Sequence, residues 1–356
     1  MAKVSMACVA ACAILIVAAC AGPAASVPPS GAPVASEPVA GSAGPVAPDP
    51  ASPAASLAPG QIPAQDLAIA RIETVESPCE LAEGLDRIWV TSLSAGLVVG
   101  IDPTTDQVVT TLSVPEGPCG VSVGFGSVWV GGGSGTVARL DPATGDTMAT
   151  VPIPGEIYDV QAGPDAVWAT DRTNGTLVRI DPATNEIDAT YELGTSADGF
   201  RITPDAIWVA ADRTNEVFRV DPADGTVVAT IEVGTKPNWV AVADEAVWVE
   251  NTGDGTVSRI DPATNEVTGT FAVGRAPVYL AVLDGRLWVA NGGGRSVSVL
   301  DADSGAPLAE IGFETGVHGL AAAAGSIWVL DLHGPRILGN LQGTTIWRLD
   351  PDRLPG

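Results

Sequence analysis

An apolar-Trp-apolar triplet recurs seven times along the chain, at intervals of 40, 39, 40, 40, 40 and 40 residues. The central tryptophans are Trp89, Trp129, Trp168, Trp208, Trp248, Trp288 and Trp328. Downstream of each triplet an apolar residue precedes an aspartate, at Asp102, Asp141, Asp181, Asp221, Asp261, Asp301 and Asp350. A period of about 40 residues that is kept this closely indicates a repeat architecture, in which each copy is one structural unit.

Each repeat is predicted to contain four short strands. Within residues 277–313 the strands are expected over 277–283, 286–291, 296–301 and 307–313. The pair Asp284-Gly285 separates the first two apolar runs, which is a hairpin signal. Four antiparallel strands in about 40 residues form the unit of a β-propeller blade. Blades pack against neighbours on both faces, which explains strands such as 246–251 that are apolar almost throughout.

The two ends of the repeat region indicate how the ring closes. The last repeat supplies three strands, near 317–323, 325–331 and 344–350. Its missing fourth strand matches residues 67–75, which stand before the first full repeat. A strand from the N-terminal side that completes the last blade removes an open sheet edge. We therefore predict an all-β, seven-bladed propeller of four-stranded blades over residues 67–356, closed by this strand.

The repeated residues are predicted to be structural. Each triplet Trp is expected to fill the space between two blades. Each repeated Asp is expected to accept hydrogen bonds from the amides of the turn between the third and fourth strands. Functional groups are therefore expected among the residues that do not repeat.

The N-terminal segment reads as a targeting and anchoring signal. An apolar run over residues 4–19 ends in Val17-Ala18-Ala19-Cys20, which resembles the lipobox of bacterial lipoproteins. The resemblance implies a lipoprotein signal peptide over 1–19, lipidation of Cys20, and an extracytoplasmic protein anchored to the cell membrane. The alternative is an ordinary secretory signal cut nearby. Residues 20–66, rich in Pro, Ala and Ser, are predicted to be a tether with too few large apolar groups to fold.

Charge and motifs exclude several classes of function. The chain has 17 Lys+Arg against 42 Asp+Glu, a formal net charge of −25, and no basic cluster. Nucleic acid binding and an electrostatic membrane patch both require clustered positive charge. The chain has no P-loop, GxSxG, CxxC or HExxH motif, and two His in total. We expect a monomer without a nucleic acid partner, in contact with the membrane through the lipid on Cys20.

Three runs carry a family resemblance. Residues 255–265 (GTVSRIDPATN), 286–294 (RLWVANGGG) and 229–237 (ATIEVGTKP) resemble YVTN-type propellers and the virginiamycin B (streptogramin B) lyases. In those lyases a His at the start of an inner strand acts as a base beside a bound Mg²⁺, and opens a cyclic depsipeptide by elimination. The resemblance, which covers residues 67–356, implies that His318 matches this His and Asp331 its assisting carboxylate. It implies a carbon-oxygen lyase as one alternative.

Two rings of non-repeating residues are predicted on one face, around the mouth of the central channel. The position ten residues before each Trp holds Cys79, Cys119, Tyr158, Asp198, Asn238, Val278 and His318. The position three residues after each Trp holds Ser92, Gly132, Asp171, Ala211, Asn251, Asn291 and Asp331. The single long insertion, within 332–343, carries His333 over the same quadrant. Loops of this kind on a rigid scaffold often carry function.

Cys79 and Cys119 leave several interpretations open. In an oxidising compartment, two Cys in one domain form a disulfide in the simplest case. Alternatively, Cys79, Cys119 and His318 form a metal site, with Asp331 or His333 as a further ligand. Unpaired buried thiols are the third interpretation.

Together these features favour a binding or interaction module that uses the channel mouth, with an unidentified small molecule or protein as its partner. The candidate ligand-binding residues are Tyr158, Asp198, Asn238, His318 and His333. The first alternative is a lyase that uses His318 and Asp331 with Mg²⁺. The second is a propeller that binds Mg²⁺ or another divalent metal through Cys79, Cys119 and His318.

Overall fold

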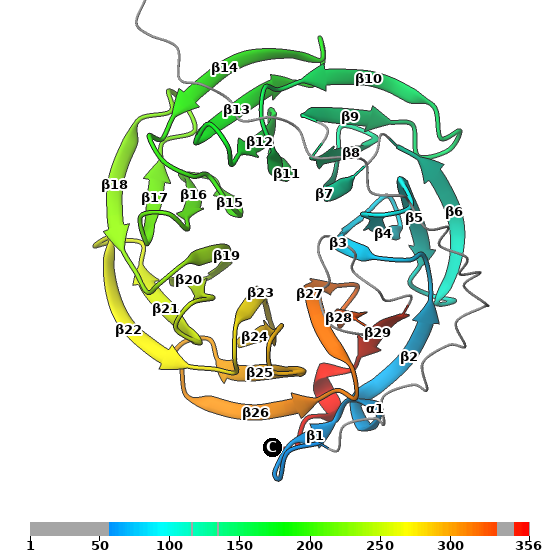
Figure 1. The fold of residues 1–356 in the computed structure, drawn as a ribbon, viewed down its shortest axis with the longest axis vertical. Helices are drawn as coiled ribbons and strands as arrows, with labels where there is room; N and C mark the ends of the chain where they lie inside the picture. Colours follow the sequence, from blue (N-terminus) through cyan, green and yellow to red (C-terminus); the bar gives the residue numbers. More distant parts are fainter. Residues whose placement is uncertain (1–56, 115–116, 134, 333–344, 356) are drawn as a thin grey trace, which may run out of the picture. The chain divides into compact units, whose positions relative to one another are not determined.

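Seven antiparallel sheets stand around one axis as the blades of a propeller (Figure 1). The structure is a computed structural model that describes residues 57–114, 117–133, 135–332 and 345–355. In every blade the innermost strand is the first of the repeat and the fourth lies on the outer side, where blade six carries one further short strand, β1. The predicted fold class and number of blades are confirmed. Within the described ranges, no helix is long and apolar enough to cross a membrane.

The first four blades follow one another along the chain. Blade one contains β3 (Pro78–Gly84), β4 (Arg87–Ser92), β5 (Leu97–Asp102) and β6 (Gln107–Ser113). Blade two contains β7 (Pro118–Gly124), β8 (Ser127–Gly132), β9 (Thr136–Leu140) and β10 (Thr147–Pro152). Blade three contains β11 (Ile157–Ala162), β12 (Val167–Asp171), β13 (Thr176–Asp181) and β14 (Glu186–Glu192). Blade four contains β15 (Phe200–Thr203), β16 (Ala206–Ala211), β17 (Glu216–Val220) and β18 (Val227–Glu232).

The last three blades complete the ring. Blade five contains β19 (Pro237–Ala243), β20 (Ala246–Asn251), β21 (Thr256–Asp261) and β22 (Glu266–Ala272). Blade six contains β23 (Pro277–Leu283), β24 (Arg286–Asn291), β25 (Ser296–Asp301) and β26 (Pro307–Gly312). Blade seven contains β27 (Gly316–Ala323), β28 (Ser326–Leu332), β29 (Thr345–Leu349) and β2 (Ala68–Glu73). A 3₁₀ turn, η1 (Pro351–Arg353), follows β29.

The ring closes as the sequence predicts. β2 pairs antiparallel with β29, with Ala68 opposite Leu349 and Glu73 opposite Thr345. The inner strands β27 and β3 lie in contact, so blade seven stands beside blade one (Figure 1). The expected N-terminal strand therefore supplies the outer edge of the last blade.

The folded part begins before residue 67, which is where the sequence predicted the propeller to start. A short strand, β1 (Ile62–Pro63), pairs parallel with the end of β26, and a one-turn helix, α1 (Ala64–Leu67), follows it. Ala64 and Leu67 are each 1% exposed and belong to the apolar core of blades five to seven. A two-residue strand has no periodic pattern, which is why the sequence did not reveal it. Cys20 and the rest of the tether up to residue 56 lie outside the described residues.

The repeated residues have the structural roles expected of them. All seven triplet tryptophans are at most 1% exposed, because they fill the spaces between blades. In the Asp-Pro turn of blade two, Asp141 Oδ1 accepts hydrogen bonds from the amides of Ala143 (2.7 Å) and Thr144 (3.0 Å). The aspartates of the other described turns make the same kind of contact.

Arginines join each of five blades to the next one. Arg139 of β9 stacks over Trp129 at 4.9 Å and donates to the carbonyl of Pro182 at 2.6 Å, in the Asp-Pro turn of blade three. Arg87, Arg219, Arg286 and Arg348 donate in the same way to the carbonyls of Pro142, Pro262, Pro351 and Pro103. The last of these contacts spans the closure between blades seven and one.

We expect Arg348→Met to lower the free energy of unfolding by about 2 kcal/mol, since it removes charged hydrogen bonds to Pro103 and Asp106 across the closure. Arg179→Met is the matched control. Arg179 occupies the same strand position and stacks over its Trp, yet pairs only with exposed aspartates of its own blade. Its loss should cost less than about 1 kcal/mol. Urea unfolding measures both; equal losses would contradict a special role for the closure link.

Candidate functional site

The inner strands are irregular at the positions where the sequence does not repeat. In β19 the register shifts between Pro237 and Val240, so that Asn238 and Trp239 lie opposite the single residue Glu250. The inner strands β3, β7, β11, β23 and β27 contain comparable shifts. A bulge interrupts the regular alternation and re-aims side chains. Two consecutive variable residues in each of these strands are thereby available near the axis.

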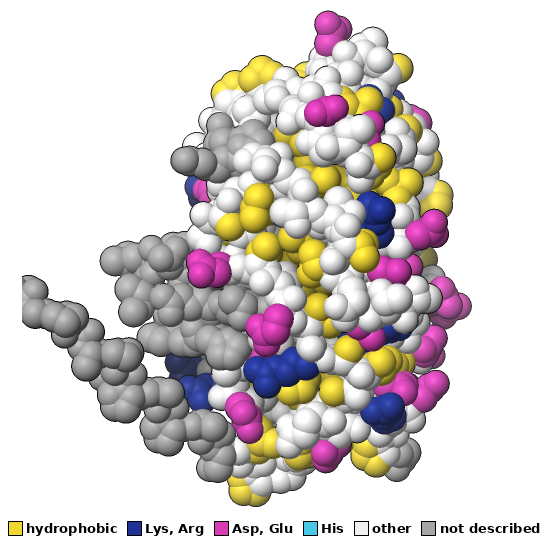
Figure 2. Space-filling view, turned by 90° about the vertical axis from the view of Figure 1, so that its right-hand side faces the viewer, with side chains coloured by type: hydrophobic (Ala, Val, Ile, Leu, Met, Phe, Trp, Pro, Cys, Tyr) yellow, Lys and Arg dark blue, Asp and Glu magenta, His cyan; other side chains and the backbone are white. Residues whose placement is uncertain are grey.

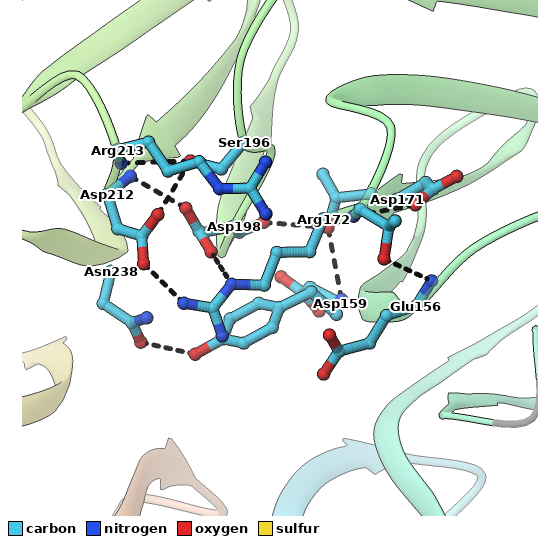
Figure 3. A network of polar contacts seen from close by, with 12 residues as sticks. Glu156, Asp159, Asp171, Arg172, Ser196, Asp198, Asp212, Arg213 and Asn238 are labelled. Atoms are coloured by element: carbon cyan, nitrogen blue, oxygen red, sulfur yellow. Dashed lines mark hydrogen bonds and ion pairs between the residues drawn. The ribbon is translucent and has the colours of Figure 1, made fainter. Parts of the chain in front are cut away.

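Arg172, directly after β12, is the centre of the polar network in Figure 3. Its Nε lies 2.8 Å from Asp198 Oδ1, and its Nη2 pairs with Asp212 Oδ2. The guanidinium carbon stands 4.9 Å from the centre of the Tyr158 ring. Asp198 is fully buried, whereas the side chain of Arg172 is 29% exposed. The network therefore presents one half-buried arginine to solvent, held by acidic groups behind it.

Further hydrogen bonds fix the two aspartates that hold Arg172. The Ser196 hydroxyl donates to Asp212 Oδ1 at 2.9 Å, and the Asp212 amide donates to Asp198 Oδ2 at 2.8 Å. The amide of Arg213 in turn donates to Ser196 Oγ at 3.2 Å. Three of the four carboxylate oxygens accept a hydrogen bond, and the fourth, Asp198 Oδ1, forms an ion pair with Arg172 without one. The two ion pairs hold the guanidinium in one orientation.

Burial and hydrogen bonding move the pKa values of these two carboxyls in opposite directions. Burial raises the pKa of Asp198 to about 6, against the lowering effect of the Asp212 amide and of Arg172. Burial also acts on Asp212, but hydrogen bonds from Ser196 and Arg172 hold its pKa below the ordinary value. Asp198 therefore changes its charge close to neutral pH, while Asp212 stays ionised.

Tyr158 connects this network to blade five. Its hydroxyl donates to Asn238 Oδ1 at 2.7 Å, past blade four (Figure 3). Burial raises the pKa of Tyr158, so the phenol keeps its proton. The structure thus brings together three residues of the first predicted ring, Tyr158, Asp198 and Asn238, with Arg172 between them.

A row of aromatic rings continues from Tyr158 to the other side of the axis. The ring centres are 6.5 Å apart between Tyr158 and Trp239, 4.4 Å between Trp239 and Tyr279, and 5.6 Å between Tyr279 and His318. Gly199 leaves the space that Trp239 occupies, because a Cβ there would lie 2.4 Å from its ring. Trp239, Tyr279 and His318 are all buried. Side chains therefore fill the axis at this depth.

Three buried acids lie beside the aromatic row. Burial raises the pKa of Glu80, Asp159 and Glu250, and the charge of Asp159 adds to the effect on Glu80. Arg201 stands 3.6 Å from Asp159 and stacks over Trp239. Each acid has one oxygen without a hydrogen-bond partner among the described residues.

Sequence reasoning missed several of these residues. The position nine residues before each Trp holds Glu80, Gly120, Asp159, Gly199, Trp239, Tyr279 and Gly319. This position varies as much as its predicted neighbour, and that variation was a usable signal. Arg172 follows Trp168 by four residues, at another position without a repeated residue type.

The second predicted ring is buried and bonded within the blades. Its members Ser92, Asp171, Asn251, Asn291 and Asp331 are at most 1% exposed. Both oxygens of Asp331 accept hydrogen bonds inside blade seven, one from the Thr315 hydroxyl and one from Trp347 Nε1 at 3.0 Å. Asn291 Nδ2 donates to Ser298 at 2.8 Å. These polar groups hold their own blade together at the end of its second strand.

Cys79 and Cys119 form a disulfide between β3 and β7, with their Cα atoms 5.2 Å apart. Neither sulfur is a thiolate in this form, so the alternative of a metal site at Cys79, Cys119 and His318 does not fit it. No group of three or more His, Cys, Asp and Glu within the described ranges is arranged to hold a metal ion, Mg²⁺ included. His333 and the rest of the long insertion lie outside the described residues.

We expect the disulfide to stabilise the propeller substantially. The two Cys are separated by 40 residues, for which loop-closure entropy gives about 4 kcal/mol. The double variant Cys79→Ala with Cys119→Ala should lose about this much free energy of unfolding, and reductant should not affect it further. Non-reducing peptide mapping of the wild-type protein should recover the linked peptides. Two free thiols with stoichiometric bound metal would contradict the disulfide.

The raised pKa of Asp198 predicts a pH dependence. The folded protein holds this proton to about pH 6, above the ordinary value of 3.8, so the free energy of unfolding falls as pH rises between these values. Asp198→Asn should reduce that fall by on the order of 2 to 3 kcal/mol between pH 4 and pH 7. Asp212→Asn is the control, because its lowered pKa acts below pH 4. Unfolding titrations that show parallel curves for wild type and Asp198→Asn would refute the assignment.

Comparisons with known proteins place the fold. No family model and no curated protein matches the chain. The structure is similar to a virginiamycin B lyase from Staphylococcus aureus, with a TM-score of 0.68 and 18% identity over 79% of this chain and 98% of that chain. It is also similar to the hydrazine synthase of Kuenenia stuttgartiensis, with a TM-score of 0.65 and 14% identity over 73% of this chain and 94% of that chain. At these identities the likeness establishes a propeller fold like that of virginiamycin B lyase.

Proposed function

We propose that this propeller is a binding module whose ligand site is the axial face of blades three to five. The observation that carries the proposal is the network around Arg172, a half-exposed guanidinium held by two aspartates from the next blade. Residues that recognise a ligand have to be oriented before it binds, because ordering them on binding costs affinity. Arginines such as Arg139 and Arg219 donate to a backbone carbonyl in the Asp-Pro turn of the next blade, whereas Arg172 pairs with two carboxylates of the next blade.

The proposal includes the cellular setting indicated by the sequence. A lipid on Cys20 would hold the propeller outside the cytoplasm, at the end of a tether rich in Pro, Ala and Ser. A rigid ring with one variable face suits capture of a molecule or protein that arrives from outside the cell. The chain has 42 Asp+Glu against 17 Lys+Arg, and on the face in Figure 2 the Lys and Arg side chains lie among Asp and Glu, which does not favour direct binding to membrane phosphates.

His318 and Asp331, on the opposite side of the axis from Arg172, are poorly placed for catalysis. A lyase mechanism would use His318 as base and Asp331 as its assisting carboxylate. Asp331, however, has both oxygens engaged by Thr315 and Trp347. His318 is 7% exposed and lies with its ring edge to Tyr279. The Arg172 side of the axis offers the more accessible polar groups.

A crystallographic fragment screen tests the proposal. With neutral, anionic and cationic fragments, we expect bound molecules to gather where Arg172, Tyr158 and Asn238 meet, and to disappear from that place in Arg172→Ala. His318→Ala should leave them unchanged. Arg201→Ala is a second control, because it removes a guanidinium of similar exposure that pairs with Asp159 instead of with Asp198 and Asp212. Fragments that bind only elsewhere, for instance in the groove of about 380 Å³ between β22 and β26, would overturn the proposal.

A further inference from the structure

We propose that the Arg172 site recognises uncharged ligands through their carbonyl oxygens, with the amide groups of a peptide as the best match. This inference rests on the proposed function and specifies its ligand. It follows from a count of the hydrogen-bond donors and acceptors that the network leaves open to solvent.

The open groups of the network are donors. Arg172 has five N–H groups, of which Nε faces Asp198 and Nη2 faces Asp212, while Nη1 has no partner among the described residues. Asn238 uses its Oδ1 to accept from Tyr158, and its Nδ2 has no described partner. Neither nitrogen is among the enclosed polar atoms that lack a partner, and both residues are partly exposed.

The acceptors of the network are engaged or enclosed. Asp212 accepts on both oxygens, from Ser196 and Arg172, and Asp198 Oδ2 accepts from the Asp212 amide. Asp198 Oδ1 lies 2.8 Å from Arg172 Nε without a hydrogen bond, but this oxygen is enclosed by the protein. A ligand ammonium group would therefore have to break an existing bond to find a carboxylate. A sugar hydroxyl carries a proton on the same oxygen that would accept here, whereas the N–H of an amide is on a separate atom that points away from its carbonyl oxygen. A carbonyl oxygen only accepts, so it matches a surface that only donates.

Charge disfavours an anionic ligand. The carboxylates of Asp198 and Asp212 stand between the guanidinium and the body of blade four, and balance its charge. The chain as a whole carries −25, and Figure 2 shows Asp and Glu side chains distributed over the visible face of the described part. An arriving carboxylate is repelled by this field, whereas a neutral amide is not.

Three small alanine derivatives, which share one skeleton and differ in charge, test the assignment of neutral carbonyl ligands. N-acetyl-alanine N-methylamide is neutral, N-acetyl-alanine is an anion, and alanine N-methylamide is a cation at pH 6.5. Titration into the protein is followed by NMR of the Arg172 and Asn238 side-chain N–H groups. We expect the neutral probe to bind about fivefold more tightly than either charged one, the difference that one well-placed hydrogen bond supplies.

Two variants link the result to the guanidinium. Arg172→Lys keeps the charge and both aspartate partners but removes the planar fork, and should weaken the neutral probe about tenfold. Arg213→Lys changes an exposed side chain whose backbone belongs to the same network, and should leave the affinity unchanged. Circular dichroism confirms that each variant folds.

The outcomes separate this inference from the proposed function. If a charged probe binds most tightly and moves the Arg172 signals, the site binds ligands but the assignment of neutral carbonyl ligands is wrong. The assignment also fails if Arg172→Lys binds the neutral probe as well as wild type does. If no probe moves the signals while fragments gather at Arg172, the site recognises another chemistry. If the fragment screen is also empty there, the proposed function fails as well.

Discussion

The ring depends on the contact between an arginine of one blade and the Asp-Pro turn of the next. The guanidinium lies over a buried Trp and donates to the turn carbonyl, so packing and hydrogen bonding act at one place. Blade one shows how strongly this contact is specified. Its strand-three position is Gly100, and Arg87 reaches the same kind of carbonyl from the second strand. A Cβ at Gly100 would lie 3.0 Å from Arg87 Cδ. The link is kept although the strand that supplies it changes.

Because repeated contacts hold the blades together away from the axis, the residues at the axis are free to differ. The bulges of the inner strands present two variable side chains in most blades, and blade five places Asn238 and Trp239 there. Buried acids such as Glu80 and Glu250 have raised pKa values, which lowers the stability of the folded protein at neutral pH. A scaffold with so many repeated contacts tolerates that cost.

The repeat made the fold predictable, because period, turn residues and apolar runs all indicated the same four strands. In residues 277–313 the predicted strands agree with β23 to β26 to within one residue. The site was predictable only in part. Tyr158, Asp198 and Asn238 could be identified because the residue type at their position does not repeat. The bulges of the inner strands, which interrupt the alternation of side chains between the two faces of the sheet, could not be read from the sequence. Arg172 could not be assigned because its partners come from another blade. The bonds of Asp331 to Thr315 and Trp347 were equally invisible in the local pattern.

The bonding of Asp198 argues that the network orients Arg172 and does not transfer protons. A pKa of about 6 is suitable for a general base near neutral pH. A base must also be reached by its substrate, and the side chain of Asp198 is fully buried behind Arg172, with the Asp212 amide on its second oxygen. Protonation of this carboxyl would therefore weaken its hold on the guanidinium. The charge of Asp198 therefore affects how firmly the guanidinium of Arg172 is held.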